Sequence, residues 1–153
     1  MSRQASGGAG ASWMPAAFWI LGLGNLANGL WMLFWPEGWY HDLPAGVPDT
    51  GPLNLHFVRD LGAAFVTMAA VFFATARNAQ RHRGVVIGIG CWYVLHSIIH
   101  LYDVWAGRLD SHHLIEDIPL VYIPTIILIV LSRPGWWADG GEIASSGLRP
   151  SSQ

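Results

Sequence analysis

Residues 84–102 read GVVIGIGCWYVLHSIIHLY, an apolar run whose only ionisable side chains besides its cysteine and tyrosines are two histidines. Its length is close to the roughly 20 residues that an α-helix needs to cross the hydrocarbon core of a bilayer. It therefore predicts a membrane-spanning helix. Ionisable groups at membrane depth cost free energy and often mark functional sites, so the histidines are candidates for function.

Three further apolar segments lie on either side of this run, at residues 13–35, about 61–76 and 118–132. The first is long enough to span, whereas the other two become long enough only if their polar beginnings are included. The whole chain of 153 residues is 52% hydrophobic and only 12% charged, too few charges for a soluble surface of that size. The sequence predicts an all-α, four-helix transmembrane bundle over residues 13–135, with residues 56–60 and 113–117 on the first turns of their helices.

The eight basic residues are all arginine, and they are unevenly divided between the two sides of this bundle. One side holds Arg3, Arg77, Arg81, Arg83, Arg133 and Arg149, and the other holds Arg59 and Arg108. The positive-inside rule then places both termini in the cytoplasm. The polar ends, residues 1–12 and 136–153, are expected to be disordered cytoplasmic segments.

Two segments near the first apolar run have their own predicted roles. The glycine-rich stretch GLGNLANG, residues 22–29, follows no strand and lies within the apolar run, so it predicts close helix packing and not a phosphate loop. The loop PEGWYHDLPAGVPDTGP, residues 36–52, is rich in proline, glycine and aromatic residues. We expect it to form a folded cap at the membrane interface.

A stripe of polar side chains lies along the second half of the run at 84–102 and extends to residue 103. Tyr93, His96, His100 and Asp103 are spaced by 3, 4 and 3 residues, which places them on one face of a helix. His96 and His100 are one turn apart and could chelate one metal ion. Asp103 extends the stripe toward the outer surface, roughly 10 Å beyond His96, so one ion cannot reach the whole stripe.

Two other predicted helices begin with the spacing His-x-x-x-Asp, at His56 and Asp60 and at His113 and Asp117. Antiparallel neighbours would bring these helix ends to the level of the stripe, on the periplasmic side. The predicted metal ligands are His56, Asp60, His96, His100, Asp103, His113 and Asp117. Mixed imidazole and carboxylate donors suit Cu, Zn or Fe better than Ca or Mg. His112 and Glu116 are expected to be only polar residues of an exposed loop.

Four further residues are expected to support a bound cofactor. Asn25 and Asn28, in the outer half of the first helix, could hydrogen-bond the ligands or line a wet cavity, and Tyr93 lies on the stripe. Arg59 could neutralise part of a carboxylate-rich site, although a purely structural pair with Asp60 would explain both residues.

The segments TGPLNLHFVRDLGAAF (50–65), LHSIIHLYDVWAG (95–107) and HHLIEDIPLVYIP (112–124) resemble a family of small four-helix bacterial membrane proteins, over about residues 35–134. This resemblance implies the fold and supplies no activity. The spacing of His96, His100 and His113 is also similar to Asp-x3-His-x12-His, an intramembrane metal site of the copper membrane monooxygenases. His96 stands at the position of the aspartate.

Three classes of function fit these features. The first is a metal-binding membrane protein whose site opens to the periplasm, either a small oxidoreductase or an accessory subunit of a membrane metalloenzyme or electron-transfer complex. The second is a haem b protein with histidines from two helices as axial ligands. The third is a structural membrane subunit. Other membrane subunits or self-association are expected, and the sequence has no basic patch for nucleic acid.

Overall fold

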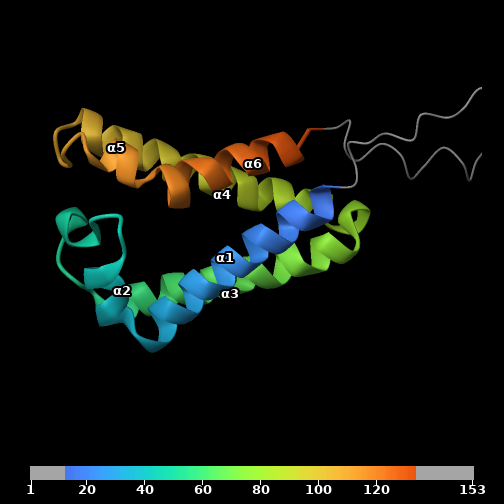
Figure 1. The fold of residues 1–153 in the computed structure, drawn as a ribbon, viewed down its shortest axis with the longest axis horizontal. Helices are drawn as coiled ribbons and strands as arrows, with labels where there is room; N and C mark the ends of the chain where they lie inside the picture. Colours follow the sequence, from blue (N-terminus) through green and yellow to red (C-terminus); the bar gives the residue numbers. More distant parts are fainter. Residues whose placement is uncertain (1–12, 134–153) are drawn as a thin grey trace, which may run out of the picture.

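The computed structural model describes residues 13–133, in which every regular element is a helix (Figure 1). The elements are α1 (Met14–Phe34), α2 (Pro36–Asp42), η1 (Val47–Thr50), α3 (Leu55–Arg77), α4 (Ala79–Trp105), α5 (His113–Glu116), η2 (Ile118–Tyr122) and α6 (Ile123–Leu131). This confirms the predicted all-α class. The expectations for residues 1–12 and 136–153 lie outside the described residues.

Three of these helices are long and apolar enough to cross a membrane: α1, α3 and the part Arg81–Trp105 of α4. Such helices indicate a membrane protein. Helix α3 begins at Leu55, so it includes the polar residues before position 61, as expected. His56 and Asp60 accordingly lie on its first turns.

The fourth apolar segment does not form one long helix. Its two pieces, the π-helix η2 and the helix α6, have five and nine residues. With α5, which holds the predicted polar beginning, they form a broken helical segment over residues 113–131. Pro119 and Pro124 lack the backbone N–H that a regular helix needs, and the Tyr122 amide donates to the Asp117 carbonyl five residues back at 3.2 Å. Within residues 13–133, single helices of spanning length are therefore α1, α3 and α4, and the fourth predicted helix is present in pieces.

Local signals fix where the helices begin. The side chain of Asn54 accepts a hydrogen bond from the Phe57 amide at 3.1 Å and caps α3, and Asn78 caps α4 through the Arg81 amide at 3.4 Å. Asn78 is also the single residue between α3 and α4. Trp35 is the single residue between α1 and α2, and Pro36 occupies the first position of α2. The predicted cap is thus folded, as α2 and η1.

Helices α1 and α3 approach closely through two glycines. A Cβ atom at Gly29 would lie 2.7 Å from the Gly62 carbonyl oxygen, and one at Gly62 would lie 2.9 Å from that of Gly29. Only glycine at both positions permits this contact, as in other membrane helix pairs. Part of the stretch 22–29 therefore packs as predicted. Gly24 does not, because a Cβ atom there would meet no described atom within 4 Å.

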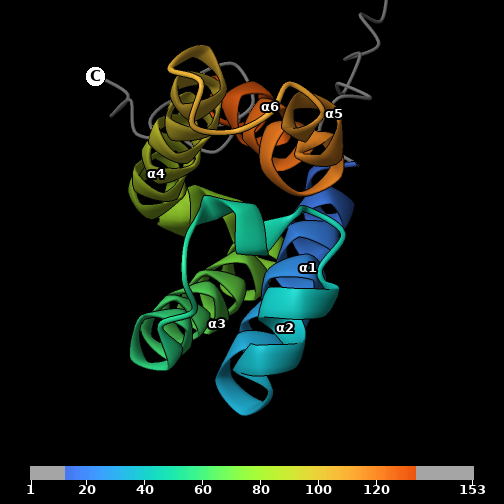
Figure 2. The same cartoon turned by 90° about the vertical axis from the view of Figure 1, so that its left-hand side faces the viewer.

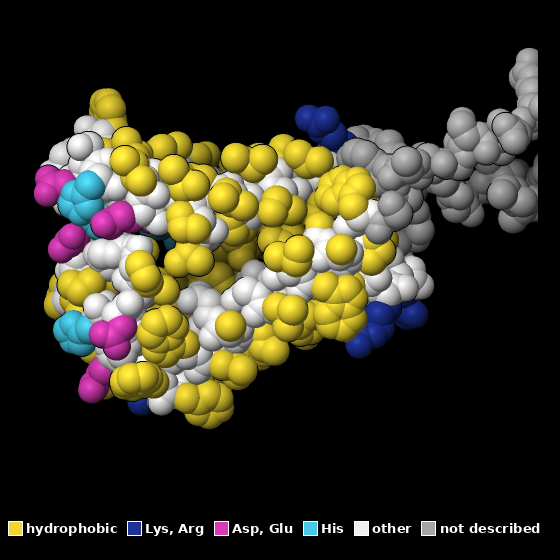
Figure 3. Space-filling view, viewed as in Figure 1, with side chains coloured by type: hydrophobic (Ala, Val, Ile, Leu, Met, Phe, Trp, Pro, Cys, Tyr) yellow, Lys and Arg dark blue, Asp and Glu magenta, His cyan; other side chains and the backbone are white. Residues whose placement is uncertain are grey.

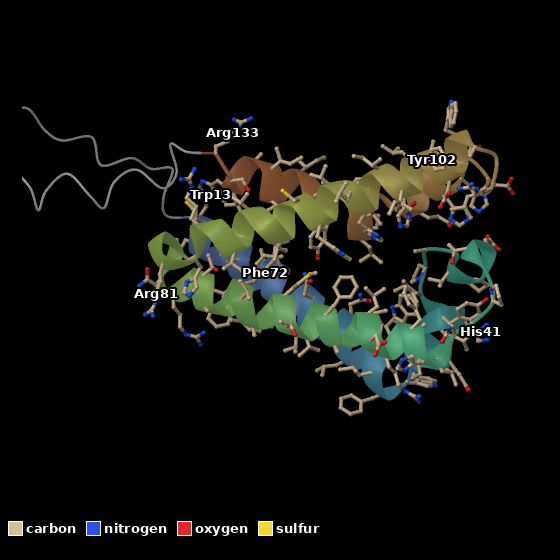
Figure 4. All side chains as sticks on the ribbon, turned by 180° about the vertical axis from the view of Figure 1, so that it is seen from behind. Trp13, His41, Phe72, Arg81, Tyr102 and Arg133 are labelled. Atoms are coloured by element: carbon tan, nitrogen blue, oxygen red, sulfur yellow. The ribbon has the colours of Figure 1, made fainter. Side chains whose placement is uncertain are left out.

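The two ends of the molecule differ in residue type. Trp13, Arg81 and Arg133 lie at one end, here called the arginine end, and His41 and Tyr102 lie at the other, the histidine end (Figure 4). The α1–α3 and α4–α6 pairs meet at the arginine end and diverge toward the histidine end (Figure 1). Seen from the histidine end, α2 lies in front of α1, and the segment that follows it reaches into the space between the two pairs (Figure 2).

The apolar core lies where the helices meet. Its fully buried side chains are Phe18, Phe72, Val86, Leu128 and Leu131, contributed by α1, α3, α4 and α6. The rings of Phe18 and Phe72 stack with centroids 6.2 Å apart. This core joins the four segments at one end and leaves the other end free to hold a site.

Candidate functional site

A cavity of about 830 Å³ lies between the α1–α3 pair and the α4–α6 pair. The molecular surface is hollowed between these pairs, and acidic and histidine side chains gather at the histidine end (Figure 3). Most lining residues are apolar, among them Leu61, Phe65 and Ile127. The polar side chains predicted to form a site that also line the cavity are Asn25, Asn28, Tyr93, His96, His100, Asp103 and Asp117.

Asn25, Asn28 and Tyr93 connect the elements around this cavity. The Tyr93 hydroxyl donates to Asn25 Oδ1 at 2.9 Å, which ties α4 to α1. Asn25 Nδ2 donates to the Leu21 carbonyl of its own helix at 2.9 Å. Trp39 Nε1 donates to Asn28 Oδ1 at 2.9 Å, which ties the cap to α1. The predicted supporting residues thus hydrogen-bond protein groups.

His100 and Asp117 form the tightest pair in the cavity wall. His100 Nδ1 lies 2.7 Å from Asp117 Oδ2, and the Asp117 residue is only 1% exposed. The other carboxylate oxygen, Oδ1, is buried with no hydrogen-bond partner in the described part of the chain. The His96 ring lies edge-on to that of His100, with centroids 4.6 Å apart, and stacks on Trp92 at 5.0 Å. The stripe on α4 and the start of the fourth segment are therefore brought together at this point.

A second group, here called the His113 cluster, consists of Asp49, His112, His113 and Glu116. One ligand atom each from Asp49, His112 and His113 can be chosen so that all three lie within 4.8 Å of one another. His113 is central and 1% exposed. Its Nε2 lies 3.2 Å from Asp49 Oδ2 and its Nδ1 lies 3.7 Å from Glu116 Oε2. The cluster thus combines two imidazoles with two carboxylates. One of the carboxylates, Asp49, lies 64 residues before His113 in the sequence.

A left-handed glycine lets the cap close over His113. Gly46, just before η1, has φ +57°, a conformation that glycine adopts without strain. A Cβ atom there would lie 2.6 Å from His113 Cε1 and 3.2 Å from Glu116 Oε2. The loop that carries Asp49 can therefore contact the imidazole only with glycine at position 46.

The other predicted ligands lie outside both groups. Asp103 lines the cavity as well, but it accepts a hydrogen bond from Arg108 at 2.9 Å and takes part in neither group. His56 and Asp60 pair with each other at 3.3 Å, and their side chains are 87% and 67% exposed. They do not line the cavity. Arg59 is exposed in a shallow hollow shared with Glu37, and the expected Arg59–Asp60 ion pair is not among those of residues 13–133.

Sequence reasoning overlooked three members of the His113 cluster. His112 and Glu116 were expected to be only exposed loop residues, and Asp49 was not considered. The spacing of His112 and Glu116, one helical turn, was the available signal for those two. For Asp49 the sequence holds no comparable signal, because its contact with His113 depends on how the cap folds back.

The cavity does not provide the pair of axial ligands expected for haem. The histidines in its wall are His96 and His100, which both come from α4. A bis-histidine arrangement from two helices is therefore not formed by the cavity-lining residues that the structure describes.

No protein-family profile, curated protein or solved structure matches this chain.

Proposed function

We propose that the protein is a multi-pass membrane protein that binds a transition-metal ion at the His113 cluster, on the periplasmic face of a bacterial inner membrane. The carrying observation is the convergence of Asp49, His112 and His113, with ligand atoms within 4.8 Å of one another around a buried imidazole. The ion would serve a small oxidoreductase or, as we favour, an accessory subunit of a membrane metalloenzyme or electron-transfer complex.

The donor set suits such an ion. Two imidazoles with one or two carboxylates match the preferences of Zn, Cu and Fe, whereas Ca and Mg prefer oxygen ligands alone. Glu116 Oε2 is buried and lacks a hydrogen-bond partner within residues 13–133, so it could turn its charge toward a cation. The accessory role is favoured because Asp49 and His112 are exposed at the tip of the molecule, where a second protein could reach the ion.

The orientation rests on the distribution of charge. Arg81 and Arg133 lie at the arginine end (Figure 4), and α5, which carries His113 and Glu116, lies at the opposite end (Figure 1). By the positive-inside rule, the arginine end faces the cytoplasm and both termini lie inside. In this arrangement η2 and α6 pack against α4 and complete a bundle with the three long helices.

Metal binding can be tested with the full chain purified in mild detergent. After treatment with a chelator and reloading with Zn²⁺, we expect stoichiometric metal by elemental analysis. Asp49→Asn should lower the affinity about tenfold or more, as loss of a ligand or its support typically does. Asp42→Asn is the matched control, because Asp42 is an exposed carboxylate of the same cap outside the cluster.

Equal zinc affinity in the Asp49→Asn and Asp42→Asn proteins would refute the His113 cluster as the site. A wild-type protein that retains no zinc would favour the purely structural subunit. An Asp49 variant is preferred to one at His113, whose buried ring could be needed for folding.

Orientation can be tested by cysteine labelling in a Cys91→Ala background. A cysteine at Asp110, in the exposed loop at the histidine end, should react in intact cells with a reagent that cannot cross membranes. A cysteine at Ala79, at the start of α4, should react only with a membrane-permeant reagent. The opposite pattern would place the His113 cluster in the cytoplasm.

A further inference from the structure

We propose that the cavity between the helix pairs binds a quinol-type lipid, a planar ring with hydroxyl groups and an apolar tail, with its head at His100 and Asp117. This site is separate from the metal site, because the His113 cluster contributes no side chain to the cavity wall. The proposal rests on the size of the cavity, its apolar rim, its unsatisfied acceptors and its aromatic wall.

The cavity is suited to a ligand that arrives from the bilayer. Its volume of about 830 Å³ is large enough for a ring with part of an alkyl tail. The lining includes large apolar side chains that are exposed at the surface, namely Ile20 of α1, Ile99 of α4 and Ile123 of α6. In a membrane these residues would meet lipid tails, so an apolar tail could pass between the helix pairs without crossing water.

One buried polar atom of the cavity wall lacks a hydrogen-bond partner in the described residues. Asn25, Asn28 and Tyr93 already hydrogen-bond within the protein. By contrast, Asp117 Oδ1 has no partner in the described residues, although Asp117 is 1% exposed. A buried acceptor without a donor costs free energy, so a native structure that retains one needs a reason, and a bound donor group would supply it.

The acceptor atoms of His100 and Asp117 that have no partner require a ligand that donates a hydrogen bond. A carboxylate accepts hydrogen bonds only, so His100 Nδ1 donates to Asp117 Oδ2. In the neutral imidazole that leaves Nε2 as an acceptor, and Asp117 Oδ1 is a second acceptor without a partner in the described residues. A hydroxyl group can donate to either atom, whereas a quinone carbonyl cannot. A fatty acid or phospholipid head would bring a second negative charge to Asp117.

Aromatic side chains next to these acceptors favour a flat ring. Trp92 and His96 stack nearly parallel, with an interplanar angle of 11°. Phe65 of the opposite pair stands edge-on to Trp92, with centroids 5.6 Å apart. All three residues line the cavity. A hydroxylated aromatic ring could pack against this wall in the stacked or edge-on geometries that aromatic rings prefer, which a sterol or simple alcohol could not do.

The test compares 2-decylhydroquinone with its dimethyl ether, which has the same ring and tail but no hydroxyl donor. Binding to the full chain in mild detergent is followed by quenching of tryptophan fluorescence, since Trp39 and Trp92 line the cavity. Oxygen is excluded to keep the ring reduced, and EDTA is present so that the metal site does not contribute. The hydroquinone should bind at least tenfold more tightly than the ether.

Two variants locate the binding. Gly24→Leu should abolish binding of both compounds, because a side chain there would enter the cavity without meeting a described atom within 4 Å of its Cβ. Gly88→Leu is the matched control, since Gly88 has similar open space and lies outside the cavity lining. Asp117→Asn should weaken hydroquinone binding about tenfold and leave ether binding nearly unchanged.

The proposal is overturned if the hydroquinone and the ether bind equally, which would indicate a nonselective apolar pocket. It is also overturned if Gly24→Leu binds the hydroquinone as tightly as Gly88→Leu does. Because EDTA is present throughout, these binding results do not depend on whether the His113 cluster binds metal. If hydroquinone binding fails, the metal proposal still stands.

Discussion

The arginine end and the histidine end are built from the same four helical segments, yet one end is closed and the other is open. At the arginine end, Phe18 and Phe72 fill the space between the helix pairs and are fully buried. At the histidine end, the pairs enclose a cavity, with a buried carboxylate, Asp117, in its wall. Close packing at one end can therefore hold the fold while the other end retains polar groups whose function requires space.

The largest expected effect is on the closed end. Phe72→Ala removes a fully buried ring from the core and should lower the free energy of unfolding by about 3–5 kcal/mol. Phe57→Ala, at an exposed position in the cavity wall of the open end, should change it by roughly 0.5 kcal/mol or less. Unfolding by a denaturing detergent would measure both. Similar losses would show that the two ends share the stability evenly.

A smaller effect is expected from the buried pair at the open end. His100→Ala leaves Asp117 buried without its hydrogen-bond partner and should cost about 3 kcal/mol. His56→Ala removes a partner from the exposed pair with Asp60 and should be close to neutral. The same unfolding titration applies.

The His100→Ala variant also tests whether metal binds at the His113 cluster or at the stripe on α4. Its zinc content should equal that of the wild type, because the His113 cluster contains no atom of His100. A variant that folds but loses zinc would move the metal site to the stripe on α4, as the sequence spacing alone suggests.

The smallest effect is expected at Arg108. Its ion pair with Asp103 is exposed to solvent, and such pairs add little to stability. Arg108→Ala should therefore leave the melting temperature in detergent unchanged within the error of measurement. A clear drop would mean that this loop helps to hold the open end, which would weaken the contrast between the ends.

Features that depend on a single helix were predicted well from the sequence. The long apolar runs predicted α1, α3 and α4, which are long and apolar enough to span, and the 3, 4, 3 spacing placed His96 and His100 on one face. The broken fourth helix was missed because hydropathy counts apolar residues and ignores the missing amides of Pro119 and Pro124.

Contacts between helices were predicted less well from the sequence. The exposed pair of His56 and Asp60 has the same spacing as His113 and Asp117, and only tertiary packing buries the second pair. Likewise, Asp49 reaches His113 because Gly46 allows the cap to fold over it. Spacing within a helix shows which side chains share a face and cannot show what that face meets.

The one-residue connection between α3 and α4 sets a strict limit on chain length. Each residue of an α-helix turns by about 100°, so one residue inserted or deleted near Asn78 within α4 would rotate the rest of α4 by that angle relative to α3. His96 and His100 would then turn away from the cavity, although they lie 18 and 22 residues further along the chain. A sequence that differs in length at this turn would have to change the face of α4 that carries its histidines.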